Sequence, residues 1–377
     1  MQDIDLGIVT SPYHGWATVR KRWEEDLADY AGSFHNIEDH APWVTRLTTH
    51  YGGGSIGRAL AGRAASHAAI GAGAKVVLLT ALANAPLVPL PRGVTYLVYG
   101  DCTNAQIANL YWGTELRFPG SWVSTCIRRL VNHGCYFLCM SEWYRDALRE
   151  EWGISEDRLV LLPFYVDTDK WKPLDPKPVK ARSQVVFIGG ELHRKGGHIV
   201  YELAQLEKFK NVDFHVVSPN AKEGPENLRV HRFLRPDSDE LIRLTAECDI
   251  FVLPTRADAS PNAPLEAAAC GIPAIITRRG GIAEIVIDGL TGSVLREPTL
   301  DSFAEELSIY LANPELVAQR GRNARQHVER NYSKTRHFAI LRNVINRAAA
   351  EVNGYVLPRL RTLPERNSTG DVGGRRV

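Results

Sequence analysis

Two carboxylates, Asp258 and Glu266, stand eight positions apart in the segment FVLPTRADASPNAPLEAAAC. The apolar start of this segment predicts a strand, and Pro264 favours a helix that begins after the following loop. Asp258 would then lie on the loop and Glu266 in the first helical turn, both facing one pocket. Paired carboxylates accept hydrogen bonds from hydroxyl groups, as sugar recognition requires. Each also has a simpler interpretation, in which Asp258 fixes the loop and Glu266 satisfies the helix dipole.

The turn that opens this helix is the second candidate. Ser260, Asn262 and Ala263 lie where the free N–H groups of the helix start would face the end of the sheet. A helix N-terminus at that place suits anionic or hydroxyl-rich ligands. We therefore expect these three residues to contact the same ligand as Glu266.

A basic turn in the segment FIGGELHRKGGHIV is the third candidate. It places Arg194 and Lys195 in a glycine-rich turn directly after another predicted strand. Fixed cations in a site that excludes water stabilise the negative charge that a leaving diphosphate gains. The alternative is a solvated basic turn that only precedes a helix.

Two further features lie in the first half of the chain. Asp101 follows the predicted strand VTYLVYG, where it either faces the cleft or caps the next helix. The Gly-x-Gly-x-x-Gly pattern of dinucleotide-binding proteins occurs at Gly52, Gly54 and Gly57. The acidic residue that holds the ribose in such proteins is missing, because no Asp or Glu occurs between Gly57 and Asp101. We therefore do not favour an NAD-binding site here. The motif is better explained as a glycine-rich helix start beside the cleft, or as plain loop geometry.

The elements that must position these residues follow a βαβα rhythm. Short apolar runs alternate with helical patterns, which is typical of parallel sheets with helices on both faces. The rhythm stops in WKPLDPKPVKARSQ and restarts at QVVFIGG. This predicts two Rossmann-like α/β units over residues 1–165 and 166–333, a helix over 334–352 that packs back toward the first unit, and a flexible tail over 353–377. Ligands bind at the carboxyl ends of parallel strands, so we expect the two units to face each other across a cleft.

Composition limits the class of protein. The chain has 377 residues, 44% of them hydrophobic and 23% charged, and a net charge of +2. These values exclude a disordered chain and a protein that coats nucleic acid by charge. No apolar stretch reaches about 18 residues, and membrane association is not favoured. The six cysteines include no Cys-x-x-Cys pair and follow no secretory leader, so we expect reduced thiols and a cytoplasmic protein.

Taken together, the motifs resemble glycosyltransferase family 4, within the glycosyl transferases group 1. Its members are retaining enzymes of the GT-B fold, with two acidic residues separated by seven, then Gly-x-Pro and Gly-Gly-x-x-Glu. Asp258 replaces the usual first Glu, and the other motif positions are matched by Glu266, Gly271, Pro273, Gly280, Gly281, Glu284 and Gly292.

The resemblance assigns roles to the candidates. It implies that Asp258 holds hydroxyls of the donor hexose and that Glu266 holds the ribose of its nucleotide. Family members carry an Arg after the strand glycine and a Lys five positions further on, both on the diphosphate. Here Gly190 occupies the Arg position and Lys195 matches the Lys, so Arg194 would supply the second cation.

The function implied by this resemblance is transfer of a hexose from a UDP- or GDP-linked sugar to a hydroxyl of a small-molecule or glycan acceptor. Asp101 would stand where many relatives place a His or Asp close to the reacting carbon. No metal or other cofactor is expected, because the cations serve the diphosphate and no Asp-x-Asp motif is present. The alternatives are an inactive nucleotide- or glycan-binding GT-B scaffold, or another GT-B enzyme such as a phosphorylase or a nucleotide-sugar epimerase.

Overall fold

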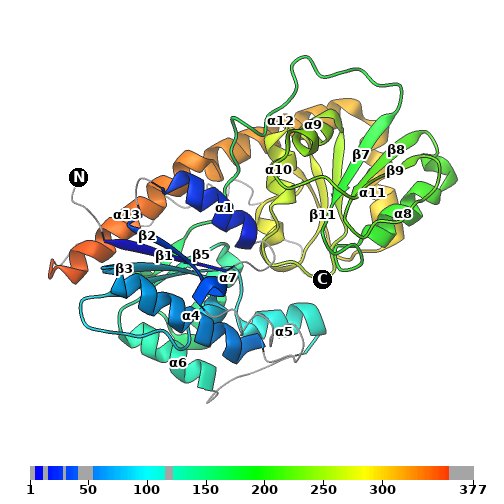
Figure 1. Ribbon diagram of the computed structural model, residues 1–377. Helices are drawn as coiled ribbons and strands as arrows, with labels where there is room; N and C mark the ends of the chain where they lie inside the picture. The colour runs from blue at the N-terminus through cyan, green and yellow to red at the C-terminus, as the bar shows by residue number, and fades with distance from the viewer. Residues whose placement is uncertain (1–4, 12–15, 29–30, 41–53, 115–121, 356–377) are drawn as a thin grey trace, which may run out of the picture.

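The computed structural model describes residues 5–11, 16–28, 31–40, 54–114 and 122–355. Figure 1 shows two α/β units, each with helices packed against a central sheet, and an orange helix that returns from the second unit to the first. Both sheets are parallel throughout. The α/β class expected from the alternation of apolar runs and helical patterns is confirmed.

The sheet of the first unit has the strand order β2-β1-β3-β4-β5-β6. Its strands are β1 (Leu6–Thr10), β2 (Ser33–Asn36), β3 (Val76–Thr80), β4 (Thr95–Gly100), β5 (Tyr136–Cys139) and β6 (Leu159–Leu161). Successive side chains point to opposite faces, so Leu78 and Leu79 belong to different core clusters. Burial on both faces explains why the inner strands β1, β3, β4 and β5 are largely apolar runs in the sequence.

The helices of the first unit cover both faces of this sheet. They are α1 (Trp16–Asp26), α2 (Ile37–His40), α4 (Gly54–Gly71), α5 (Asn104–Trp112), α6 (Trp122–Asn132) and α7 (Glu142–Trp152), with the 3₁₀ helices η1 (Leu82–Asn84) and η2 (Glu156–Arg158). Residues of α4, α6 and α7 pack in the core cluster on one face, and residues of α1 pack in the cluster on the other. Gly54 and Gly57 of the glycine motif lie at the start of α4, whereas Gly52 is outside the described residues.

The face covered by α1 is shared with α13 (Lys334–Val352), the orange helix of Figure 1. Phe338, Leu341, Ile345 and Ala348 of α13 recur at helical spacing and are buried in this core. Tyr136 Oη also donates a hydrogen bond of 2.7 Å to Glu351 Oε1. The last described helix of the chain is therefore part of the core of the first unit. Most of the predicted tail, residues 356–377, is outside the described part of the chain.

The second sheet has the strand order β12-β11-β10-β7-β8-β9. Its strands are β7 (Ser183–Ile188), β8 (Val212–Val217), β9 (Leu228–His231), β10 (Ile250–Leu253), β11 (Ala274–Thr277) and β12 (Gly292–Leu295). Its helices are α8 (Gly197–Gln205), η3 (Glu207–Phe209), α9 (Asp239–Glu247), α10 (Ala263–Ala269), η4 (Gly280–Glu284), α11 (Leu300–Ala312) and α12 (Pro314–Asn331). The strand order reverses between β7 and β10, which is the place where open α/β sheets bind ligands.

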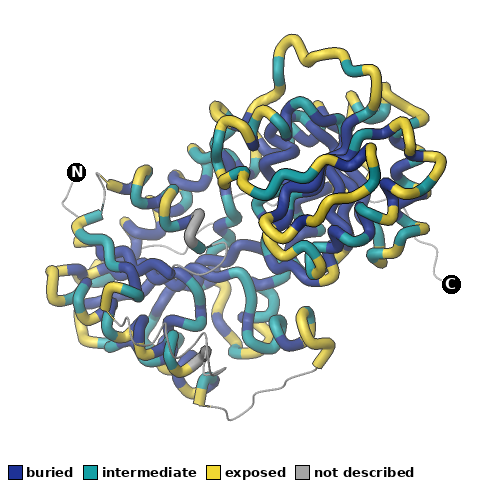
Figure 2. The backbone as a smooth tube through the Cα atoms, turned by 45° about the vertical axis from the view of Figure 1, so that its right-hand side comes forward, coloured by how far each residue is buried: buried dark blue, intermediate teal, exposed yellow. Residues whose placement is uncertain are grey.

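The chain passes between the units twice, and the two passages lie side by side. Val166, on the way out, forms a bridge with Ser333, on the way back. The segment between Val166 and β7 continues into an exposed loop that arches above the second unit, whereas the central strands of both sheets are buried (Figure 2). None of the helices in the described residues combines the length and the apolar composition that a membrane span requires. All six cysteines are described, and all are free thiols.

Candidate active site

The loops that follow β7 and β10 bring Lys195 and Asp258 into contact. The two strands are neighbours at the reversal of strand order, so their loops leave the sheet side by side. Lys195 Nζ donates to Asp258 Oδ2, and only 14% and 9% of the two side chains are exposed. The cation and the acid, which the resemblance assigns to one donor, thus form a shielded ion pair.

The backbone holds these two loops together. Arg256 N donates to Arg194 O at 2.9 Å. Gly196 has a φ of 79°, and a Cβ at this position would lie 1.8 Å from Pro254 O. The close approach therefore requires glycine beside Lys195, because any side chain would push the two loops apart.

Arg194 lies beside the pair but is held by the protein. Its Nη1 donates to Ala257 O at 2.6 Å and its Nη2 to Glu191 Oε1 at 2.7 Å. The guanidinium also lies 5.3 Å from the ring centre of Tyr111, a residue of α5 in the first unit. Arg194 therefore brings positive charge to the region where the two units meet, while two of its nitrogen atoms already have partners.

Glu266 is buried in the first turn of α10 and faces the first unit. Its Oε1 accepts a hydrogen bond of 3.1 Å from Arg22 Nη2 of α1. Burial raises the pKa of Glu266 to about 7, although the charge of Arg22 opposes this shift. The predicted ribose contact is therefore a carboxylate whose ionisation depends on a residue of the other unit.

Asp101 follows β4 of the first unit, at the carboxyl end of the sheet. Burial raises its pKa to about 6, and the negative charge of Asp258 adds to the shift. The interpretation of Asp101 as a helix cap is wrong. The residue that caps α5 is Thr103, whose side chain accepts from Gln106 N, while Gln106 Oε1 accepts from Thr103 N.

Asp101→Asn is expected to stabilise the protein at pH 8 by up to about 3 kcal/mol and by less than about 1 kcal/mol at pH 4.5. The pKa of Asp101 is raised from 3.8 to about 6 in the folded chain, so stability falls as the pH rises through that window. The amide carries no charge and avoids this loss. Urea denaturation at the two pH values measures it, with the exposed Asp5→Asn as control. An equal gain at both pH values would contradict the argument.

The remaining predicted residues lie in the same two loops and at the start of α10, and in the described part of the chain none has a hydrogen bond to the pair. Gly190 is exposed, and a Cβ there would meet nothing within 4 Å. Asn262 occupies the N-cap position of α10, but its side chain makes no capping hydrogen bond. Its Oδ1 is buried and has no partner among the described residues. Ser260 is half-buried on the approach to the helix, and Ala263 is the first helical residue.

Sequence reasoning missed Arg22 and Asp237. Arg22 lies in VRKRWEED, where charges of both signs are typical of a solvated helix face. One signal was available, since Arg22 follows the buried Val19 by three positions and directly precedes the buried Trp23. Asp237 belongs to the polar segment before α9 and offered no comparable signal.

Glu284, the acid of the Gly-Gly-x-x-Glu motif, joins the two units. Its Oε2 and Oε1 accept hydrogen bonds of 2.8 Å from the backbone N–H groups of Glu142 and Trp143. These residues begin α7 of the first unit, where free N–H groups favour a carboxylate. The motif thus contributes to the junction between the units.

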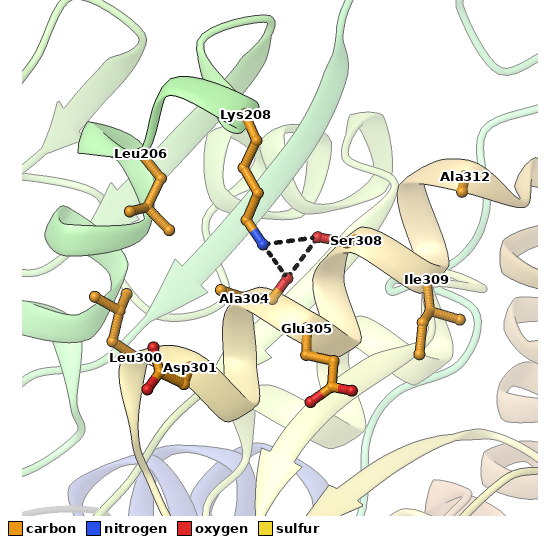
Figure 3. Close-up of a pocket in the computed structure, with 9 residues that line it drawn as sticks. All are labelled: Leu206, Lys208, Leu300, Asp301, Ala304, Glu305, Ser308, Ile309 and Ala312. Carbon is orange, nitrogen blue, oxygen red and sulfur yellow. Dashed lines mark hydrogen bonds between the residues drawn. The ribbon is translucent and has the colours of Figure 1, made fainter.

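A wide hollow of about 670 Å³ lies elsewhere, on the outer side of the second unit. It is lined by Leu206, Lys208, Leu300, Asp301, Ala304, Glu305, Ser308, Ile309 and Ala312. Figure 3 shows that Lys208 points toward α11, where its Nζ donates to Ala304 O and Ser308 Oγ. No predicted site residue lines this hollow. Nor do the described residues contain a group of three or more His, Cys, Asp or Glu side chains able to hold a metal ion.

Solved structures with this architecture define its class. Sucrose-phosphate synthase from Thermosynechococcus elongatus superposes with a TM-score of 0.67 at 13% identity, covering 92% of this chain and 99% of that one. HepE of Anabaena, solved in complex with UDP-glucose, gives 0.62 at 15% identity, with 93% and 99% covered. The fold is GT-B, as the sequence motifs implied.

Sequence comparison places the family signal in the second unit. Residues 175–327 match the family of glycosyl transferases group 1. Glycogen synthases of Mycobacterium tuberculosis are 25% identical over 240 residues, covering 58% of this chain and 58% of each relative. An N-acetylgalactosaminyltransferase of Campylobacter jejuni that acts on an undecaprenol-linked substrate is 29% identical over 214 residues, with 50% and 54% covered. The chain thus spans somewhat more than half the length of these relatives.

Proposed function

We propose that the protein is a retaining hexosyltransferase that uses a UDP- or GDP-linked sugar and an acceptor hydroxyl. The observation that carries the proposal is the shielded Lys195–Asp258 pair at the reversal of strand order, with Glu266 at the start of the neighbouring helix. This arrangement offers a cation to a diphosphate and carboxylates to sugar hydroxyls. The family match of the second unit and the UDP-glucose complex of HepE support the same donor class.

In the proposed reaction the bond between the sugar C1 and the diphosphate oxygen breaks, and the acceptor oxygen bonds to C1 from the same face. The acceptor proton passes to the leaving diphosphate, so no protein base is required. Lys195 and Arg194 stabilise the charge that develops on the diphosphate. Asp258 orients the hexose and Glu266 the ribose. Because fixed cations serve the leaving group, we propose a reaction that needs no metal cofactor.

Two variants separate the proposed roles of the carboxylates. Glu266→Ala is expected to weaken binding of UDP or GDP by about tenfold or more, because hydrogen bonds to a charged group contribute roughly 1.5 to 3 kcal/mol. Asp258→Ala should reduce turnover more than it weakens binding of the free nucleotide, because its proposed ligand is the hexose. Titration calorimetry measures binding, and release of UDP or GDP from a panel of nucleotide sugars measures turnover.

The control is Glu305→Ala, which removes an exposed carboxylate from the outer hollow and should change neither quantity. If the wild-type protein binds neither UDP nor GDP, the proposed function is wrong. Binding that is lost in Glu305→Ala but kept in Glu266→Ala would place the nucleotide in the outer hollow instead.

A further inference from the structure

Arg22 of the first unit reaches the second unit through a set of directed hydrogen bonds. Its Nε and Nη2 donate to the two carboxylate oxygens of Asp237, at 3.1 and 2.8 Å. Nη2 also donates to Glu266 Oε1 at 3.1 Å, and Nη1 donates to Tyr165 O at 3.0 Å. Only 12% of the Arg22 side chain is exposed. The guanidinium is thus fixed in orientation while it contacts the predicted ribose carboxylate.

Asp237 is itself held in place by the second unit. Trp171 Nε1 donates to its Oδ1 at 3.1 Å, and Lys170 Nζ donates to its backbone oxygen. Its φ of 60° is unusual for a residue other than glycine, and such conformations persist where the surroundings enforce them. Although burial favours its neutral form, the hydrogen bond from Arg22 keeps the pKa of Asp237 below its ordinary value. Asp237 therefore serves as a fixed, charged anchor for the guanidinium.

The contact leaves one oxygen of Glu266 available. Among the described residues, Arg22 is the one hydrogen-bond partner recorded for this carboxylate, and it uses Oε1. Oε2 has no hydrogen-bond partner within the described ranges, so it can accept a hydroxyl hydrogen. A carboxylate at a nine-tenths-buried position needs a partner that favours its charged form, since burial alone favours the neutral acid. Arg22 is the cation that faces it, while Asp237 and Cys270 are the other titratable groups that interact with it.

We propose that Arg22 is a positioning residue for nucleotide binding: it orients and keeps charged the Glu266 carboxylate, which then accepts the ribose hydroxyls of a nucleoside diphosphate. This inference rests on the proposed function. It makes nucleotide affinity in the second unit depend on the placement of α1 in the first. If Arg22 only held the two units together, its bidentate contact with Asp237 would suffice. The additional contact with Glu266 instead ends on the carboxylate that we propose binds the nucleotide.

The test is titration calorimetry of the full chain with UDP and with GDP between pH 6 and pH 9. Arg22→Met keeps much of the side-chain volume and removes the charge. We expect it to weaken nucleotide binding by about tenfold or more at pH 7, with partial recovery at pH 9, because removing the cation that opposes the effect of burial raises the pKa of Glu266 further. Titration of the nucleotide phosphate is common to both proteins and cancels in the ratio of their dissociation constants.

Two further variants separate positioning from other effects. In a Glu266→Gln background the carboxylate is absent, so adding Arg22→Met should change affinity by less than about threefold and should not change its pH dependence. Arg20→Met is the matched control, because Arg20 lies on the same helix and pairs with Glu24 of that helix. It should bind nucleotide as the wild type does. If Arg22→Met fails to fold, Arg22→Gln replaces it, because glutamine also removes the charge while its amide can still donate hydrogen bonds.

The outcomes distinguish the two proposals. Wild-type protein that binds neither nucleotide overturns the proposed function itself. Wild-type binding with an unchanged affinity and pH profile in Arg22→Met overturns the positioning role alone. An equal loss in the wild-type and Glu266→Gln backgrounds also overturns it, because Arg22 would then act without Glu266. A loss confined to the background that retains Glu266, with an upward shift of the pH profile, supports it.

Discussion

Lys195→Ala is expected to slow release of nucleoside diphosphate from the donor by about a hundredfold or more and to destabilise the fold by about 3 kcal/mol. The rate falls because a fixed charge that stabilises the leaving group contributes most in a shielded site. The fold is destabilised because removing one partner leaves Asp258 as a buried charge without its cation. Release of UDP or GDP measures the first effect, and urea denaturation measures the second.

A double variant separates the two effects of Lys195. Lys195→Met combined with Asp258→Asn removes both charges, so it should recover most of the lost free energy of unfolding while activity stays low. Lys208→Ala, which removes a lysine from the outer face of the second unit, should leave the rate unchanged. Normal activity in Lys195→Ala would remove Lys195 from the proposed mechanism.

Gly196→Ala is expected to abolish nucleotide binding and to lower the free energy of unfolding by about 3 kcal/mol or more. The added methyl group would lie 1.8 Å from Pro254 O, and the φ of 79° is unfavourable for alanine. The loops that carry Lys195 and Asp258 would have to separate. Urea denaturation and titration calorimetry with UDP and GDP measure the two consequences.

Gly190→Ala is the matched control for this substitution in the same loop. A Cβ at Gly190 meets nothing within 4 Å, so the free energy of unfolding should change by no more than about 0.5 kcal/mol. Similar behaviour of the two alanine variants would show that the close approach at Gly196 does not determine how the loops are held.

The sequence predicts those parts of the molecule that depend on local patterns. Buried parallel strands are continuous apolar runs, so the two sheets were predictable from runs such as KVVLLTA and QVVFIGG. Lys195 and Asp258 follow neighbouring strands, and the carboxyl ends of parallel strands meet at one edge of a sheet. Their common pocket could therefore be inferred without coordinates.

The contacts between the units could not be predicted in this way. Arg22 and Glu266 are 244 positions apart and meet only because both units are folded and docked. No periodicity or spacing encodes such a pair. The helix-cap interpretation of Asp101 was wrong for a local reason. Thr103 lies three residues before Gln106, so this pair completes a capping box that Asp101 is too early in the chain to form.

The return of α13 to the first unit sets the order in which the protein is completed during synthesis. The strands of the first unit end at Leu161, but the helix that completes the cover on one face of its sheet begins at Lys334. At typical translation rates the ribosome needs roughly ten to thirty seconds to make the intervening chain. We expect the apolar side chains that later contact Leu341 and Ile345 to be partly uncovered on the nascent chain during that time. The first unit is therefore synthesised first, but its hydrophobic core is completed last.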